Sequence, residues 1–222
     1  MKIAVTNLKG GVGKTTITVN LAASFTARGK KVCIIDTDQK QHSAIEWAGI
    51  RSEERALIQV VAMGQNQINN KILADFEEKF DVVLLDGTPQ LSELATRTIL
   101  VSDILIIPIS PSIFDFRAFE SFLKLVNEMN ENRLAAGLKE VTPYIVLNRI
   151  NQSANIAKEI GEALQDYNTP MTKTRLVNRT AYASDASDGL GVVEGKDKKA
   201  AAEFNLFTDE IEAIINALST KL

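Results

Sequence analysis

The chain has 222 residues, of which 45% are hydrophobic, and this is enough to bury one sizeable core. Its formal net charge of −3 means that any contact with nucleic acid has to come from a local basic patch. The single cysteine, Cys33, and the single histidine, His42, exclude an internal disulfide, a cysteine-pair metal site and a histidine-based metal or triad site. Without a long apolar run or a leader-like sequence, we expect one domain, 1–222, located in the cytoplasm and not in a membrane.

Strand patterns and helix patterns alternate along the chain. Strands are predicted over Lys2–Asn7, Val32–Asp36, Leu57–Ala62, Asp81–Asp86, Ile104–Ile109, Pro143–Asn148 and Pro170–Leu176. Helices are predicted over Lys14–Arg28, Asn66–Lys79, Ser92–Val101, Phe114–Met129, Ala154–Tyr167 and Lys198–Leu218. The strands are nearly continuous apolar runs, which is typical of strands covered on both faces. The sequence therefore predicts an α/β fold with a doubly wound, mostly parallel sheet and helices on both faces, in which ligands bind at the carboxyl ends of the strands.

A glycine-rich segment lies between the first predicted strand and the first predicted helix, which is the context of a phosphate-binding loop. Glycines let successive backbone N–H groups point into one concave nest, and the N-terminus of the following helix adds partial positive charge. Lys14 can reach the β- and γ-phosphates, and the Thr15 hydroxyl can bind Mg²⁺. Leu8 stands where the strict motif has glycine, so the loop is a deviant form. The predicted nucleotide-binding residues of this loop are Gly10, Gly11, Val12, Gly13, Lys14, Thr15 and Thr16.

Two further strands end in acidic residues. The second strand ends at Asp36, which Thr37 and Asp38 follow, and the fourth ends at Asp86, just before Gly87. An apolar strand that ends in Asp has the form of a Walker B element, whose carboxylate holds Mg²⁺ directly or through water. We therefore expect the Asp86 strand to lie next to the first strand, with Asp36 close by.

A second lysine, Lys9, precedes the glycines of the loop. With this lysine, the segment 9–15 resembles the phosphate loop of the ParA/MinD group of deviant-Walker ATPases, and the likeness extends to about Leu218. It is greatest to the small ParA subtype, such as the ParF-like proteins. The resemblance implies ATP or ADP and Mg²⁺ as cofactors, and a homodimer in which Lys9 reaches the nucleotide of the partner subunit. A second cation fits the chemistry, because a loose phosphoryl-transfer transition state spreads negative charge.

The same resemblance assigns roles to the acids and to the end of the sixth strand. Asp36 is expected to support the hydration shell of Mg²⁺, Asp86 to be the Walker B carboxylate, and Asp38 to orient the attacking water. The family often has proline after the second acid, whereas Gln39 follows Asp38 here. Asn148 and Arg149 are predicted to contact the nucleotide, with the Asn148 amide on the adenine edge. A cap or turn role is the alternative for Asn148.

Basic residues gather late in the chain, around an irregular segment predicted at 186–199; they are Lys173, Arg175, Arg179, Lys196, Lys198 and Lys199. The stretch 179–190 resembles the corresponding part of small plasmid-type ParA proteins. In that family, basic residues near this position bind DNA without sequence preference in the ATP-bound dimer, and phosphate contacts supply such affinity. Arg179, Lys196 and Lys199 are therefore the predicted DNA contacts, and an ordinary solvated lysine surface is the alternative.

The resemblance implies an ATPase that hydrolyses ATP slowly and segregates plasmid or chromosome DNA, associated with the nucleoid and stimulated by a cargo-bound or centromere-bound adaptor protein. Two other functions stay open. One is a MinD-like or cargo-positioning ATPase. Its MinD-like, membrane-cycling form would need a basic amphipathic C-terminal helix to bind lipid, whereas Asp209, Glu210 and Glu212 make that region acidic. A small-molecule ligase with the same phosphate loop is the second alternative.

Overall fold

The computed structural model describes residues 1–151, 160, 162–164 and 166–220. Its centre is a parallel sheet of six strands in the order β3-β2-β4-β1-β5-β6. The strands are β1 (Lys2–Val5), β2 (Val32–Asp36), β3 (Gln59–Ala62), β4 (Val82–Asp86), β5 (Ile104–Ile109) and β6 (Thr142–Leu147). The helices are α1 (Lys14–Ala27), α2 (Ser43–Ile50), α3 (Asn70–Glu77), α4 (Glu93–Val101), α5 (Ile113–Ala135), α7 (Thr180–Ser187) and α8 (Lys198–Ser219).

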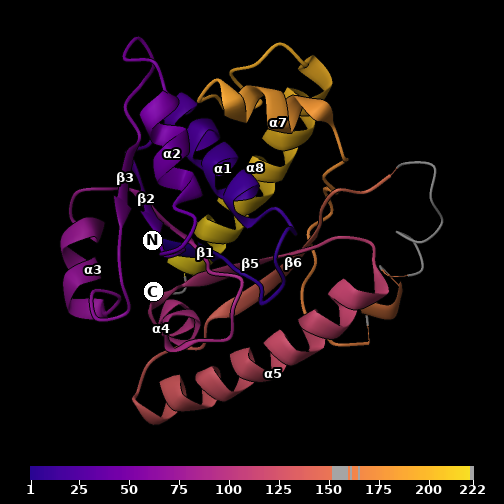
Figure 1. Ribbon diagram of the computed structural model, residues 1–222. Coiled ribbons are helices and arrows are strands. Elements are labelled where there is room, and N and C mark those ends of the chain that lie inside the picture. The colour runs from indigo at the N-terminus through magenta and orange to yellow at the C-terminus, as the bar shows by residue number, and fades with distance from the viewer. Residues whose placement is uncertain (152–159, 161, 165, 221–222) are drawn as a thin grey trace.

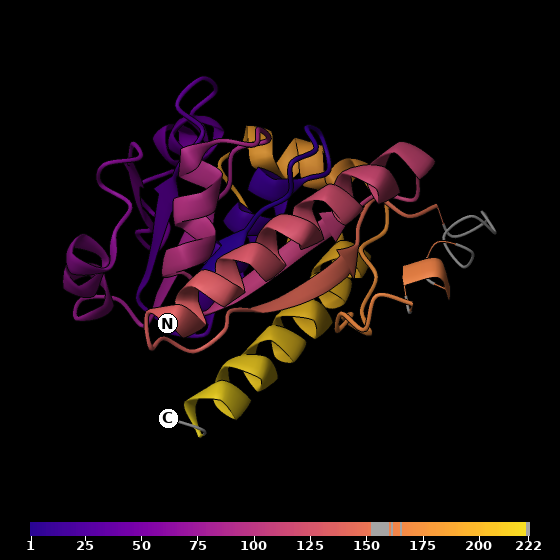
Figure 2. The same cartoon turned by 90° about the horizontal axis from the view of Figure 1, so that it is seen from below.

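The helices cover both faces of the sheet (Figure 1). One core cluster joins Ile34 of β2 to side chains of α1, α2, α7 and α8, whereas the other joins the next residue, Ile35, to α3, α4 and α5. Successive residues of a strand point to opposite faces, so the apolar runs serve both clusters at once. In Figure 2, α5 runs across the face that is turned toward the viewer. The predicted α/β fold class is thus confirmed, and every strand pair of this sheet is parallel.

The sheet order brings the predicted functional ends together. β4 lies between β1 and β2, and Asp36 is the direct register partner of Asp86. The loop after β1 therefore begins beside both acids, as the sequence predicted. All three strands end at the same edge of the sheet, where ligands of doubly wound folds bind.

Some predicted elements differ from the structure. The predicted strand Pro170–Leu176 is not a strand: its one bridge to β6 joins Met171 to Ile145. The N–H groups of Lys173 and Thr174 donate instead to Glu210 of α8. The predicted helix Asn66–Lys79 begins only at Asn70, with the Asn69 side chain as its cap. The short helices α2 and α7 were not predicted. The predicted helix Ala154–Tyr167 falls largely outside the described residues.

Candidate active site

The phosphate loop runs from the end of β1 to Lys14, the first residue of α1. Gly11 and Gly13 adopt left-handed backbone conformations, with φ of 78° and 95°. Glycine is required at Gly13 for a second reason, since a Cβ atom there would lie 2.3 Å from the amide nitrogen of Asn148. The loop therefore has the tight backbone shape that lets N–H groups converge on an anion at the start of α1.

Three side chains from neighbouring strand ends hold this loop. Asn148 Nδ2 donates to the carbonyl oxygen of Val12 over 2.7 Å, and Arg149 donates to the carbonyl oxygen of Gly11 over 2.6 Å. Asn7, at the end of the first strand, accepts the Lys9 N–H over 3.2 Å and donates to the Pro108 carbonyl. Asn148 and Arg149 are thus brought to the loop, where they bind its backbone. The contact of Asn148 with adenine and that of Arg149 with the nucleotide stay predictions.

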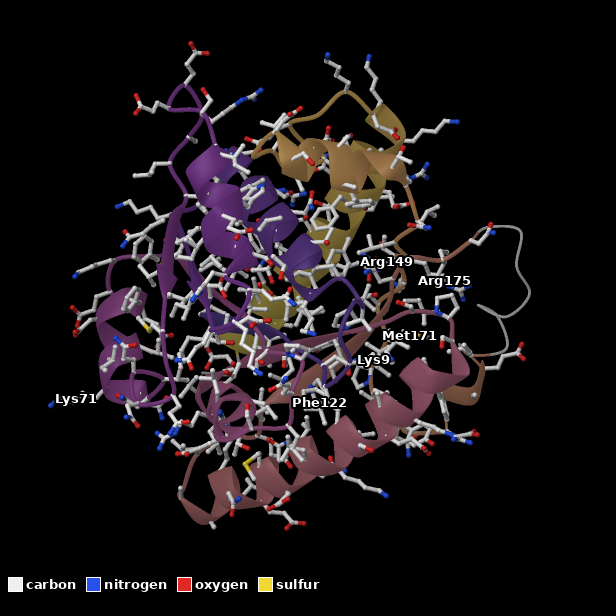
Figure 3. The ribbon with its side chains drawn as sticks, in the orientation of Figure 1. Lys9, Lys71, Phe122, Arg149, Met171 and Arg175 are labelled. Carbon is white, nitrogen blue, oxygen red and sulfur yellow. The ribbon has the colours of Figure 1, made fainter. Side chains whose placement is uncertain are left out.

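The two lysines of the loop occupy different environments. Lys14 is only 7% exposed, and its ammonium group donates to the carbonyl oxygen of Lys9 over 2.8 Å. Burial lowers the pKa of Lys14 to about 8, although the nearby carboxylates of Asp86 and Asp38 oppose the change. Lys9, labelled in Figure 3, is exposed. Lys14 is therefore placed to exchange a backbone carbonyl for a phosphate of its own nucleotide, whereas the Lys9 side chain is accessible to a partner.

A cluster of hydroxyl and carboxylate oxygens lies beneath the loop. Asp86 is buried and accepts hydrogen bonds from Thr15 Oγ1 at 2.6 Å and Thr18 Oγ1 at 3.2 Å. Burial raises the pKa of Asp86 to about 7; the hydrogen bonds of the two threonines lower it and the charge of Asp36 raises it. Oxygen ligands of this kind are those that Mg²⁺ prefers, so Thr15 and Asp86 are residues that would hold this ion.

Asp36 and Asp38 lie at the turn after β2. Asp36 accepts the N–H of Asp38 at 3.0 Å with one oxygen, and the N–H groups of Ala44 and Ile45 at 3.1 and 3.3 Å with the other. Asp38 is partly exposed and lines the cavity in front of the loop. Asp36 therefore anchors the start of α2, and Asp38 faces the space where a nucleotide phosphate and a water molecule would lie.

A cavity of about 500 Å³ opens in front of the phosphate loop. The loop, Asp38 and Arg149 form one part of its wall; the rest comes from α2, through Trp47 and Ile50, and from the last residues of α7, Ala186 and Ser187. This volume is within the range of small-molecule and cofactor sites. The loop, Asp38 and Arg149 thus meet around one space of the size of a cofactor site.

The predicted DNA-binding residues lie elsewhere. Arg179 donates to Glu203 of α8 at 3.2 Å and is partly buried. Lys196 and Lys199 are exposed, on the segment before α8 and in its first turn. They flank Asp197, whose carboxylate caps α8.

The sequence analysis did not predict several residues of the site. Thr18 binds Asp86, and the Thr37 hydroxyl donates to the Asp86 carbonyl oxygen at 2.6 Å. Thr18 lies one helical turn after Lys14 and Thr37 lies between two acids, so both positions carried a signal. Nothing in the sequence around Arg51, which fixes α2 to the segment after α7, indicated its role.

Comparison with known proteins identifies the family. The model of the CobQ/CobB/MinD/ParA nucleotide-binding domain matches residues 3–192. The chain belongs to this family. Its members are ATPases, so this ParA/MinD-family protein is an ATPase, as predicted from the loop and the acids.

Individual relatives agree with this family. The maintenance of carboxysome distribution protein A (McdA) of Halothiobacillus neapolitanus is 26% identical over 214 residues, which cover 94% of this chain and 95% of that protein. The structure of apo McdA from Cyanothece has a TM-score of 0.78 at 16% identity, over 94% of this chain and 98% of that one. MinD of Pyrococcus horikoshii, with a TM-score of 0.71 at 20% identity and 96% of each chain covered, was solved with Mg-ADP, which matches the predicted cofactors.

Proposed function

We propose that this ATPase is a ParA-type positioning protein. ATP drives formation of a homodimer, the dimer binds DNA without sequence preference, and slow hydrolysis resets the cycle to segregate plasmid or chromosome DNA or a comparable cargo. A cargo-bound adaptor protein stimulates hydrolysis. In this proposal the chain acts as one ATPase domain, 1–222, in the cytoplasm and on the nucleoid.

The observation that carries the proposal is the contrast between the two lysines of the loop. Lys14 is buried against its own loop, where it can bind one side of the phosphates. Lys9 is exposed at the opening of the same loop. A transition state that spreads charge over the γ-phosphoryl group is stabilised by cations on several sides. An exposed lysine at this position fits a role in the active site of a partner subunit across a two-fold interface. Such a trans role requires a dimer.

The residues of the site divide the chemistry between them. Lys14 leaves the Lys9 carbonyl oxygen to bind the β- and γ-phosphates, and the loop N–H groups hold the remaining phosphate oxygens. When bound, Mg²⁺ neutralises charge on the phosphates, and Thr15, Asp86 and, through water, Asp36 would hold it. Asp38 orients the attacking water from the cavity wall.

Binding to DNA is assigned to the exposed lysines of the basic segment 196–199, together with Arg179. Lys196 and Lys199 are free to contact phosphates, and Arg179 contributes after its ion pair with Glu203 opens. Each subunit alone offers few contacts, but a dimer brings two sets onto one duplex and gains avidity. With three contacts per subunit, log affinity should fall with log salt at a slope of about −5, from roughly −0.9 for each neutralised phosphate.

A salt titration by fluorescence anisotropy tests this proposal on two duplexes of unrelated sequence. The ATP form should bind both duplexes alike and the ADP form should bind neither. Lys199→Ala, present in both subunits, should flatten the slope by about 2. The matched control is Lys71→Ala, an exposed lysine of α3 on the other side of the sheet (Figure 3), which should leave the slope unchanged. Strong preference for one duplex would contradict the proposal.

A membrane-cycling role is disfavoured by the packing of α8. Its apolar face, with Phe204, Phe207 and Ile211, is buried in the core against α1 and β-sheet residues. In the part of the chain that the structure describes, no helix is long and apolar enough to cross a membrane. Because the apolar face of α8 is buried, sedimentation with anionic vesicles in the presence of ATP should leave the protein in the supernatant. A ligase role would be supported by turnover that needs a small substrate and ignores DNA.

A further inference from the structure

Helix α2 connects the acidic turn of the active site with the segment that precedes α8. At its start, the N–H groups of Ala44 and Ile45 donate to Asp36 at 3.1 and 3.3 Å. A carboxylate at this position satisfies free N–H groups of a helix and interacts favourably with its dipole. The first turn of α2 is therefore fixed to the end of β2, next to Asp86.

The other end of α2 is fixed by Arg51, which follows the last helical residue. Its guanidinium group donates to both carboxylate oxygens of Glu194, at 2.8 and 2.7 Å, and to the Gly189 carbonyl oxygen at 2.9 Å. The two charged side chains are only 5% and 13% exposed. Burial by itself raises the pKa of Glu194, but the hydrogen bonds of Arg51 and of the Gly191 N–H hold that pKa below its usual range. A paired fork of this kind has a defined geometry and is little screened by solvent.

A further hydrogen bond and a close backbone approach join α2 to the same segment. Trp47 Nε1 donates to the Leu190 carbonyl oxygen at 3.2 Å, and the Arg51 guanidinium lies 5.3 Å from the centre of the Trp47 ring. Gly189 has φ of 67°, and a Cβ atom there would lie 2.6 Å from the backbone of Arg51. The end of α2 and the segment 189–194 are therefore packed backbone to backbone, and together they form one contact unit.

This unit borders the nucleotide cavity on one side and the basic segment on the other. Trp47 and Ile50 line the cavity, as do Ala186 and Ser187 at the end of α7. Glu194 lies two residues before Lys196. A ligand that fills the cavity would therefore contact the α2 side of this unit, and the 189–194 side continues directly into the lysines assigned to DNA.

We propose that the ion pair of Arg51 and Glu194 is a latch that transmits occupancy of the nucleotide cavity, through α2, to the basic segment 196–199. Arg51 is a positioning residue: it touches neither nucleotide nor DNA, and it makes the placement of Lys196 and Lys199 depend on the nucleotide. The part of this inference that concerns DNA affinity rests on the proposed function. The coupling of α2 to the segment 189–199 does not rest on it.

The test compares Arg51→Ala and Glu194→Gln with the parent protein. Both variants should keep the ATP affinity, measured by calorimetry, and the ATP-dependent dimer, measured by light scattering. Affinity of the ATP form for duplex DNA should fall by about 5- to 150-fold, the range typical of allosteric coupling. Hydrogen exchange of the amides in 189–199 should respond to ATP in the parent and not in the variants. Glu194→Gln keeps the side-chain shape, so it serves if Arg51→Ala does not fold.

The control is a more exposed set of ion pairs away from the cavity. Arg28 links α1 to Asp209 and Glu212 of α8 at 2.7 Å, so Arg28→Ala should leave both DNA affinity and the exchange response unchanged. Parental DNA affinity and parental exchange in both latch variants would overturn the latch. If the parent binds no DNA in any nucleotide state, the proposed function fails. Hydrogen exchange then decides about the latch. Loss of the ATP response of 189–199 in the variants would support it, and a parental response in both variants would overturn it.

Discussion

Replacement of Gly13 by alanine should damage the phosphate loop through two separate effects. Gly13 caps α1 with φ of 95°, a conformation that residues with a Cβ atom rarely adopt. The new methyl group would also lie 2.3 Å from Asn148 Nδ2, the atom that donates to the Val12 carbonyl oxygen. The variant therefore strains the backbone and displaces a side chain that holds the loop.

The size of the effect follows from these two terms. A non-glycine residue in a sparsely populated backbone region costs about 1–3 kcal/mol. Loss of the hydrogen bond between Asn148 and Val12 adds about 0.5–1.5 kcal/mol. A combined cost of roughly 1.5–4.5 kcal/mol corresponds to about 10- to 2000-fold in an equilibrium constant. If the empty loop of the variant relaxes to another shape, the cost lowers the affinity for ATP. If the loop keeps its shape, the cost lowers the free energy of unfolding.

Calorimetry of Mg-ATP binding and denaturant unfolding should be measured on the same preparations. Gly137→Ala is the matched control, since Gly137 has φ of 73° but no atom within 4 Å of the added Cβ position. It should lose stability through strain alone and keep its ATP affinity. Removing the obstructing amide should make Gly13→Ala with Asn148→Ala less damaging than the sum of the single changes. Parental ATP affinity in Gly13→Ala, with stability no lower than that of Gly137→Ala, would refute the reasoning.

Three further variants test the roles of the charged residues. Lys14→Ala should weaken ATP binding about ten- to a hundredfold, because it removes a charge-assisted contact of roughly 1.5–3 kcal/mol; unchanged affinity by calorimetry would contradict the assignment of the loop. Lys9→Ala should bind ATP as a monomer but fail to dimerise, and an ATP-induced dimer in light scattering would exclude the trans role. Asp38→Ala should accumulate as an ATP-bound dimer because the water loses its orienting carboxylate. Parental phosphate release in this variant would transfer the role to Asp36.

The parts of the fold that were predicted correctly are those with strong local signals. The loop between β1 and α1 carries its glycines, lysine and threonine in one run, so neighbouring residues are enough to indicate its conformation. The neighbouring positions of Asp36 and Asp86 followed from two apolar strands that end in acids. Periodicity places such strands well, because β-strands of a covered parallel sheet are short continuous apolar runs.

The missed elements depend on contacts between distant residues. Helix α2 begins after His42, whose left-handed conformation and uncapped side chain give no start signal, and the cap comes instead from Asp36. Helix α7 likewise begins without a side-chain cap. Arg51 and Glu194 are separated by 143 residues, and nothing near either residue in the sequence indicates their pairing. Local propensity cannot reveal elements that tertiary contacts stabilise.

The charges around the basic segment explain why an acidic protein can still present a cationic surface. Glu194 is paired with Arg51, and Asp197 caps α8, where the N–H groups of Ala200 and Lys199 hold its pKa below the usual value. Among the described residues, Lys196 and Lys199 have no carboxylate within 4 Å. Glu194 and Asp197 are thus engaged in holding the segment, whereas Asp185 and Asp188 line the same surface hollow as Lys196. Lys196 and Lys199 are themselves exposed to solvent. Because one copy offers so few of them, useful affinity for a duplex requires two copies held at a fixed distance. Lys9 provides the link, since the residue proposed to complete the catalytic site across the interface would also bring the second set of lysines.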